Sequence, residues 1–252
     1  MPTSQTIAAF LNSALRIARF TDTSNNGLQV ANTGNSVHVA CGVDASLEFF
    51  KAARARGADM VVCHHGLSWG DSLKYITGLN HQRLKFLIDN DMALYACHLP
   101  LDAHPRLGNN AGMARALGLR ELKPFGLYHG ASIGVRGRLP RPLPLARFVK
   151  MVERAAGNEA RLMAFGRPTV RSVAMVVGGG AVGLEEAAGA GVDVYLSGEP
   201  SLAAYTTASD LGMNAVFAGH YATETFGVKA LAILIAKKFK VRTAFIPMGV
   251  RY

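Results

Sequence analysis

The sequence predicts an α/β protein made of two intertwined βα-repeat lobes with mixed, mostly parallel sheets. Short apolar runs typical of strands alternate with Ala-rich stretches typical of helices along most of the chain, which indicates βαβ units. The order strand, helix, strand occurs before residue 66 and returns after residue 171, which indicates duplicated half-units. The chain has 252 residues, of which 50% are hydrophobic, enough to bury a large core.

The elements of the first half follow from capping and helix-breaking residues. Residues 1–20 have an amphipathic pattern without an early basic cluster or a cleavage site, so we expect a first helix and not a signal peptide. Residues 37–44 (VHVACGVD) predict a buried strand, and Asp44 or Ser46 is the expected N-cap of the next helix. Gly57 ends that helix before the strand-forming run ADMVVC.

The second half repeats this order from residue 172 onward. SVAMVVGGG (residues 172–180) predicts a strand, LEEAAGAG a helix and VDVYLSGE another strand. We therefore predict a first lobe at residues 1–125 and a second lobe at residues 126–252. The C-terminal helix and strand are expected to return to the first lobe.

Aligning RARGADMVVCHHG with AGAGVDVYLSGEP brings residue types of the two halves into register. Asp193 follows Asp59 by 134 positions, and the same offset places Glu199 opposite His65. Chance similarity between two βαβ units is an alternative explanation for the hydrophobic matches.

A second pair of segments, MALYACHLPLD and NAVFAGHYATE, aligns at an offset of 122 positions. This offset pairs His98 with His220 and Asp102 with Glu224, so that each half ends a strand with His-x-x-x-carboxylate. A histidine and a carboxylate repeated at one spacing are harder to attribute to chance, and they favour duplication.

Six side chains that can bind metal ions follow apolar runs at the expected carboxyl ends of strands. They are His64, His65, His98, Asp102, His220 and Glu224. Open α/β sheets bind ligands outside that edge, so we expect these side chains to converge. Imidazole with carboxylate suits zinc, iron, manganese, cobalt or nickel better than magnesium or calcium. We predict two divalent metal ions per chain, with the two adjacent histidines each serving a different ion.

The local sequence refines this prediction and offers alternatives to it. His220 and Glu224 are four residues apart, which places both on one face of a helix. Pro100 opposes a regular helix after His98, so we expect a turn there. A strand-end histidine alone is more often a satisfied polar residue, Asp102 is also a plausible helix cap, and Glu224 suits the first turn of a helix. The joint occurrence of all six favours metal binding.

Composition disfavours several classes of protein. The longest apolar helical stretch, residues 227–235, contains a lysine and is shorter than the roughly 20 residues of a membrane span. With neither a signal peptide nor a membrane span expected, we expect a cytoplasmic protein. The three cysteines lie in apolar runs without a disulfide or CxxC pattern, so we expect reduced thiols. The formal charge of +10 permits anionic partners. The densest basic stretch, residues 135–148, has no interleaved stacking aromatics, which favours a solvated surface over nucleic-acid binding.

The motifs also resemble those of a known family. NNGLQV, VCHHGLSWG, HLPLDAHPRLGNNAGMARALGL, YLSGE and GHYATE are similar to motifs of the dinuclear-metal-centre proteins related to NGG-one-interacting factor three, which include YbgI-like proteins and carry the name GTP cyclohydrolase I type 2 homologue. The resemblance covers nearly the whole chain. It implies a homo-hexameric ring with the metals facing an inner cavity. Some members carry an extra domain between the halves, but here the second half-unit fills the segment between Asp102 and His220, so we expect the short form. The resemblance also implies that two divalent ions are held by His64, His65, Asp102, His220 and Glu224, with His98 as a sixth ligand or close neighbour.

Two functions are compatible with these residues. The first is a metal-dependent hydrolase of an anionic, nucleotide-like or phosphorylated small molecule, and the second is a metal-handling or scaffold protein without turnover. At most six ligands for two ions leave room for water, which favours hydrolysis. Glu199 is the candidate for orienting that water.

GGGAVG (residues 178–183) resembles a phosphate-binding turn, although a tight connection is its more common role. Trp69 is expected to pack, with a pocket wall as the alternative.

Overall fold

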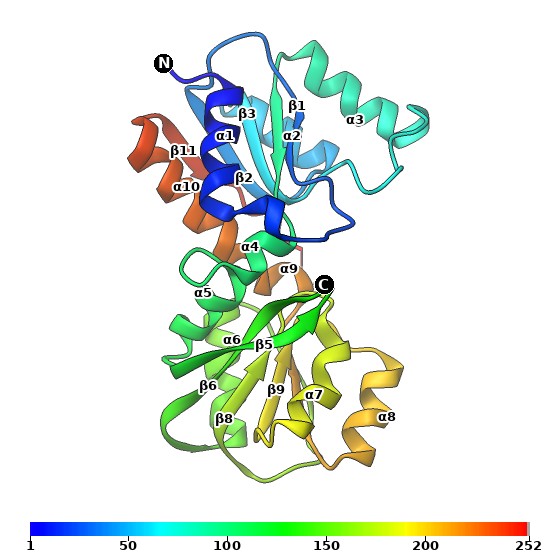
Figure 1. Cartoon of the computed structure of the whole chain (residues 1–252), viewed down its shortest axis with the longest axis vertical. Helices are drawn as coiled ribbons and strands as arrows, with labels where there is room; N and C mark the ends of the chain where they lie inside the picture. Colours follow the sequence, from blue (N-terminus) through cyan, green and yellow to red (C-terminus); the bar gives the residue numbers. More distant parts are fainter. Residues whose placement is uncertain (251–252) are drawn as a thin grey trace. The chain divides into compact units, whose positions relative to one another are not determined.

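The computed structural model describes residues 1–250 and divides into two compact units. The first unit comprises Met1–Leu101 and Gly227–Gly249, and the second comprises Asp102–Phe226 with Val250. The C-terminal strand therefore belongs to the same unit as the N-terminal helix (Figure 1). Two helices carry the chain from one unit to the other: α4 (Leu99–Ala103) and α10 (Thr225–Phe239).

The first unit contains a five-stranded sheet in the order β1-β4-β3-β2-β11. Strands β4, β3, β2 and β11 are parallel neighbours, and β1 pairs antiparallel with β4. The strands are β1 (Gly27–Val30), β2 (His38–Asp44), β3 (Met60–His65), β4 (Ala93–Ala96) and β11 (Arg242–Phe245). The remaining elements are α1 (Ser4–Leu15), the 3-10 helix η1 (Ile17–Arg19), α2 (Leu47–Ala55) and α3 (Gly78–Asp89).

Both faces of the parallel strands are buried in this unit. Helices α2 and α3 place Phe49, Phe50 and Leu87 against Val61 and Cys63 on one face. The alternate side chains of β3 are also fully buried, as expected for a parallel sheet with both faces covered. This burial explains why β3 is a continuous apolar run up to its histidines, and it fixes the strand end from which they project.

The second unit contains a six-stranded sheet in the order β5-β6-β8-β9-β10-β7. Strands β8, β9 and β10 are parallel neighbours, whereas the pairs β5–β6, β6–β8 and β10–β7 are antiparallel. The strands are β5 (Arg120–Tyr128), β6 (Ala131–Pro144), β7 (Arg161–Met163), β8 (Thr169–Met175), β9 (Val194–Ser197) and β10 (Asn214–Phe217). The helices are α5 (Asn109–Ala116), α6 (Leu145–Ala156), η2 (Gly180–Gly183), α7 (Leu184–Gly189), α8 (Leu202–Asp210) and α9 (His220–Thr223).

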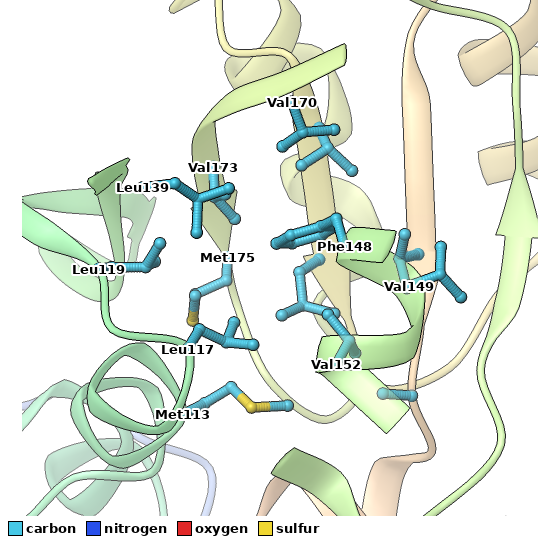
Figure 2. Packing of buried hydrophobic residues seen from close by; sticks show 14 of the residues in the cluster. Met113, Leu117, Leu119, Leu139, Phe148, Val149, Val152, Val170, Val173 and Met175 are labelled. Carbon is cyan, nitrogen blue, oxygen red and sulfur yellow. The ribbon is translucent and has the colours of Figure 1, made fainter. Parts of the chain in front are cut away.

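Helices cover both faces of this sheet as well. On one face, Phe148 and Val152 of α6 and Met113 of α5 pack against Val173 and Met175 of β8 (Figure 2). On the other face, α7 and α8 bury their small apolar side chains against the alternate residues of β8, β9 and β10. The parallel strands therefore form the centre of the unit, and their carboxyl ends are held in fixed register.

The structure confirms the predicted α/β fold with repeated half-units. Strands β2, β3 and β4 are neighbours in the first sheet, as β8, β9 and β10 are in the second, and each set has an antiparallel strand beside its last member. Asp59 accepts a hydrogen bond from Val37 N at 2.9 Å, and Asp193 accepts one from Arg171 N at 3.0 Å. Each of these donors and acceptors is related to its counterpart by the offset of 134 positions found in the sequence.

The structure corrects the expected turn in HLPLDAH, because residues 99–103 form the short helix α4 with Pro100 in its first turn. A proline is tolerated there, since the first backbone N–H groups of a helix have no intrahelical acceptor. HYATE is also less regular than expected. Helix α9 ends at Thr223, and α10 begins at Thr225 after a break at Glu224.

Two further expectations concern membrane-spanning helices and the cysteine thiols. Over residues 1–250, every helix is too short or too polar to cross a membrane. Cys41, Cys63 and Cys97 are buried free thiols, and burial raises the pKa of the Cys41 thiol to about 12. The cysteines are therefore core residues of the first unit.

Candidate metal centre

Three histidines of the first unit come together at the carboxyl ends of β3 and β4. His64 and His65 are the last residues of β3, and His98 follows β4 by two residues. Each offers a ring nitrogen, and these three atoms lie within 4.8 Å of one another. The ring centroids of His64 and His65 are 4.6 Å apart, and those of His64 and His98 are 5.2 Å apart. The first unit thus gathers its three predicted ligands into one cluster.

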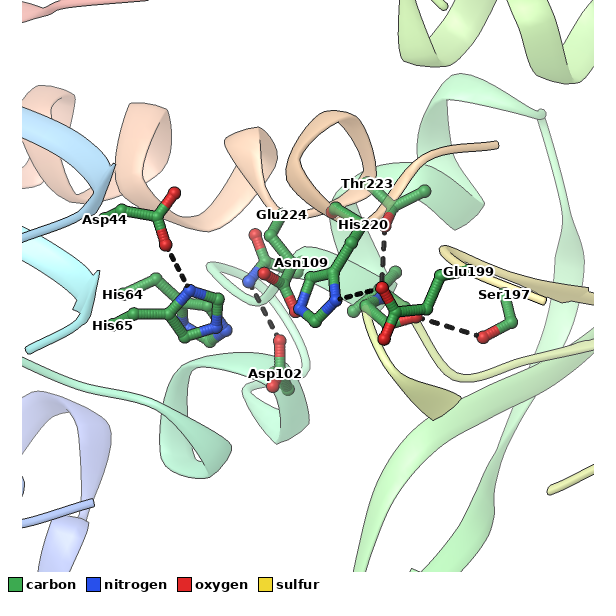
Figure 3. Close-up of polar contacts among 12 residues, drawn as sticks. Asp44, His64, His65, Asp102, Asn109, Ser197, Glu199, His220, Thr223 and Glu224 are labelled. Carbon is green, nitrogen blue, oxygen red and sulfur yellow. Dashed lines mark hydrogen bonds and ion pairs between the residues drawn. The ribbon is translucent and has the colours of Figure 1, made fainter. Parts of the chain in front are cut away.

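An oxygen acceptor holds Nδ1 of each imidazole in this cluster. His64 Nδ1 lies 3.0 Å from the carbonyl oxygen of Cys97. His65 Nδ1 lies 2.8 Å from Asp44 Oδ1 (Figure 3). His98 Nδ1 lies 2.9 Å from Asp22 Oδ1. Carbonyl and carboxylate oxygens only accept hydrogen bonds, so Nδ1 is the donor in every ring. In a neutral imidazole this tautomer puts the lone pair on Nε2, which is the arrangement of histidine ligands to zinc.

The NNGLQV motif holds the loop that follows the two adjacent histidines. Gln29 Oε1 accepts hydrogen bonds from Leu67 N at 2.7 Å and Ser68 N at 3.1 Å. A Cβ added to Gly66 would meet the amide of Gln29 and the methyl group of Ala96. Glycine at this position therefore lets the backbone leave β3 directly after its last histidine.

Trp69 packs against the histidine cluster, as the sequence led us to expect. Its ring centroid lies 5.0 Å from that of His98 in an edge-to-face arrangement and 6.0 Å from that of His65. The indole Nε1 donates a hydrogen bond to Gly66 O at 2.9 Å. Trp69 therefore restricts the rotation of both imidazoles.

The second unit places His220 between two carboxylates. His220 Nε2 lies 3.2 Å from Glu224 Oε1, and His220 Nδ1 lies 3.2 Å from Glu199 Oε2 (Figure 3). Burial disfavours the charged ring, but Glu224 and then Glu199 outweigh that effect and raise the pKa of His220 to about 9. Without a metal ion, this ring therefore binds a proton at neutral pH.

The spacing of His220 and Glu224 also fits one metal ion. Zinc binds histidine nitrogen and carboxylate oxygen at roughly 2.0–2.2 Å, so two ligand atoms of one ion are about 3–3.5 Å apart. The separation of 3.2 Å falls in this range. The proton on Nε2 and a divalent ion are thus alternative occupants of the same position.

Asp102 joins these residues in the second unit. Its carboxylate lies within 4.8 Å of that of Glu224, and its side chain is fixed by Asn109, whose Nδ2 donates to Asp102 Oδ1 at 2.8 Å. The neighbouring Asn110 donates to Ile133 O at 2.9 Å and accepts from Val177 N at 3.1 Å. The asparagine pair of the sequence GNNAG thus orients one predicted ligand and anchors α5 to the sheet.

The glycine run after β8 approaches this cluster closely. Gly178 has φ of +62°, and a Cβ there would overlap the carboxylate of Glu224 and lie 3.0 Å from His220 Nε2. Gly178 O accepts a hydrogen bond from Glu199 N at 3.2 Å. The run is therefore a tight connection that leaves space for two carboxylates, which is the more common of the two roles considered for it.

We expect Gly178→Ala to destabilise the protein more than Gly191→Ala does. Both glycines have positive φ, but Gly191 has no heavy atom within 4 Å of an added Cβ, apart from its chain neighbours. Gly191→Ala should therefore cost only the backbone strain, about 1 kcal/mol, whereas Gly178→Ala adds a collision worth about 1–3 kcal/mol. Urea unfolding measures both costs, and equal values would contradict the close packing described for Gly178.

The sequence relates the chain to proteins of one family. A family model described as Duf34/NIF3 (NGG1p interacting factor 3) matches residues 2–249. A protein of Deinococcus radiodurans named GTP cyclohydrolase 1 type 2 homolog is 42% identical over 240 residues, covering 95% of this chain and 91% of the relative. A protein of Pyrococcus abyssi with the same name is 43% identical over 241 residues, covering 95% and 96%.

Solved structures give the same relationship. The protein ybgI, described as of unknown function, superposes with a TM-score of 0.93 at 33% identity, covering 99% of this chain and 100% of that one. A protein of Thermus thermophilus superposes with a TM-score of 0.90 at 34% identity, covering 98% and 100%. The similarity therefore extends over both units.

Proposed function

The chain belongs to the Duf34/NIF3 family, and we propose that it binds two divalent metal ions. The proposed ligands are His64, His65, His98, Asp102, His220 and Glu224. The observation that carries the proposal is the common tautomer of the three histidines in the first unit, each held at Nδ1 by an oxygen acceptor. Metal-binding histidines need this second contact to fix the ring and to place the lone pair on the other nitrogen.

We propose that the metal centre serves hydrolysis of a nucleotide-like or phosphorylated small molecule. Bound divalent ions supply Lewis acidity and a nucleophilic water at neutral pH. Glu199 is one-third exposed and contacts His220 through one carboxylate oxygen, so its carboxylate is suited to orient a water and accept its proton. Support for the substrate class comes from the relatives named GTP cyclohydrolase 1 type 2 homolog and from the net positive charge of the chain.

The test is a metal analysis followed by a substrate screen. Freshly purified protein is assayed for metal content, stripped with a chelator, and reloaded separately with zinc, manganese, iron, cobalt or nickel. Each form is then incubated with nucleotides and phosphoesters. We expect metal-dependent hydrolysis of at least one anionic substrate. No turnover with any metal, together with rapid transfer of the ions to a chelator, would instead favour a metal-handling protein.

Zinc affinity should rise about tenfold per pH unit from about pH 7.5 to pH 9 and then level off. The reason is the pKa of His220, which burial lowers but which Glu224 and Glu199 together raise to about 9. Below that pH the ring must release a proton before Nε2 can bind zinc. Calorimetry at pH 7.5 in buffers of different ionisation enthalpy should show about one more proton released by the wild type than by His220→Ala. Equal proton release in the two proteins would contradict this assignment.

The homo-hexameric ring stays a prediction of the family resemblance, and the cytoplasmic location stays a prediction from the sequence. Light scattering coupled to gel filtration tests the first, with an expected mass six times that of the 26.8 kDa chain. A monomer at micromolar concentration would contradict it.

A further inference from the structure

We propose that Asp22 is a positioning residue that directs Nε2 of His98 toward a metal ion, and thereby makes His98 a true ligand. The inference rests on the proposed metal binding, because it assigns a role within the same centre. Asp22 lies in the loop between α1 and β1, 76 residues before His98. Sequence patterns at the strand ends give no indication of this residue.

The carboxylate of Asp22 is surrounded by hydrogen-bond donors. Its Oδ1 accepts from Ser24 N at 3.0 Å and contacts His98 Nδ1 at 2.9 Å. Its Oδ2 accepts from Asn26 Nδ2 at 2.9 Å and from Leu99 N at 3.0 Å. The side chain is 2% exposed. Both the ring of His98 and the backbone directly after it are therefore held by one buried group.

Asn26 completes this hold on His98. Its Oδ1 accepts the hydrogen bond of His98 N at 2.7 Å, while its Nδ2 donates to Asp22. The loop thus fixes the backbone on both sides of the His98 side chain as well as the ring itself. Trp69 also packs edge-to-face against the imidazole. These contacts together restrict the orientation of the ring.

The negative charge of Asp22 suits a role beyond that of a loop anchor. A buried carboxylate is costly unless a positive charge compensates it. Among residues 1–250, Asp22 contacts the ring of His98, and hydrogen-bond donors satisfy its remaining lone pairs. A neutral loop residue would serve an anchor alone, whereas a carboxylate also compensates a cation bound at the far side of the imidazole.

Two comparisons within the chain support this role. His220, the counterpart of His98 in the repeat, also has a carboxylate on Nδ1, namely Glu199. The two carboxylates come from unrelated positions in the sequence, so they do not follow from the duplication itself. Asp44 holds His65 in the same way, but its side chain is 47% exposed. Asp22 is therefore the most constrained of the three.

The test uses zinc as the probe and measures its affinity by competition with a chromophoric chelator. Asp22→Asn keeps the size of the side chain. Its NH2 group, however, would take the place of either Oδ1 or Oδ2, and each of these oxygens now accepts from two donors. We expect zinc affinity to fall about 10–100-fold. In the His98→Ala background, Asp22→Asn should have no further effect, because Asp22 acts through His98. Asp91→Asn is the matched control, since Asp91 binds Thr33 in the same unit away from the histidines.

Metal-free urea unfolding separates lost affinity from a damaged fold. If Asp22→Asn is too unstable to assay, Asn26→Ala weakens the same hold and should lower affinity only when His98 is present. An unchanged zinc affinity in Asp22→Asn, or an equal loss in the His98→Ala background, would overturn the inference. Failure of the wild-type protein to bind zinc would instead refute the proposed function.

Discussion

Replacing Glu224 with alanine should remove at least one of the two proposed divalent ions from each chain. The side chain of Glu224 is 3% exposed, and its Oε1 lies 3.2 Å from His220 Nε2. Its carboxylate also lies within 4.8 Å of that of Asp102. A carboxylate in this position can bind an ion together with the histidine, and a truncated side chain supplies no replacement oxygen.

The measurement is the metal content of the protein after reloading with zinc and exhaustive dialysis. Glu185→Ala, at an exposed carboxylate in the first turn of α7, is the matched control and should keep the wild-type content. Asp102→Ala should lower the content as Glu224→Ala does. Unchanged metal content in both variants would refute the ligand assignment in the second unit.

Glu199→Gln should keep both metal ions but lose at least about 100-fold in turnover of the substrate that the screen identifies. A glutamine can still accept the hydrogen bond of His220 Nδ1 through its amide oxygen, because the half-buried side chain is free to rotate its amide. It cannot accept a proton from water at neutral pH. Glu199 differs in this respect from Asp22, whose two oxygens both face donors.

Metal content and thermal stability of Glu199→Gln, measured beside its turnover, distinguish a catalytic role of Glu199 from a structural one. Metal content measured at saturating zinc should match that of the wild type, and thermal unfolding should be similar. Glu185→Gln, at an exposed carboxylate of the second unit, serves as the control for turnover. If Glu199→Gln retains full turnover, Glu199 does not handle the proton, and a role in holding His220 remains.

The sequence was sufficient to predict the parallel strands of the two repeats and the polar residues at their ends, but not the antiparallel strands β1, β5, β6 and β7. Buried parallel strands are recognisable as apolar runs because both faces are covered, and β3 and β10 are of this kind. Candidate ligands at the carboxyl ends of such strands, including His64 within the end of β3 and His220 three residues after β10, were therefore selected by their position. The repeat was visible because Asp59 and Asp193 serve the same backbone contact in each half.

Residues that hold the candidate ligands were not predicted, because their contacts join distant parts of the chain. Asp22 and Asn109 carry no periodic pattern and lie outside the strand ends. The helix at Pro100 was missed because the proline falls in its first turn, where its missing N–H has no cost. The close approach of Gly178 to Glu224 likewise depends on tertiary packing. Glycine and asparagine runs next to strand ends were the one available signal.

The most direct test of the metal centre is anomalous diffraction from crystals of the zinc-loaded protein, recorded at the zinc absorption edge. We expect two anomalous peaks per chain, each about 2.0–2.2 Å from ligand atoms drawn from the six proposed residues, with His98 Nε2 among them. Soaking the crystals in chelator should remove both peaks. The absence of peaks at these residues in zinc-loaded crystals, or peaks confined to other side chains, would contradict the proposed metal centre.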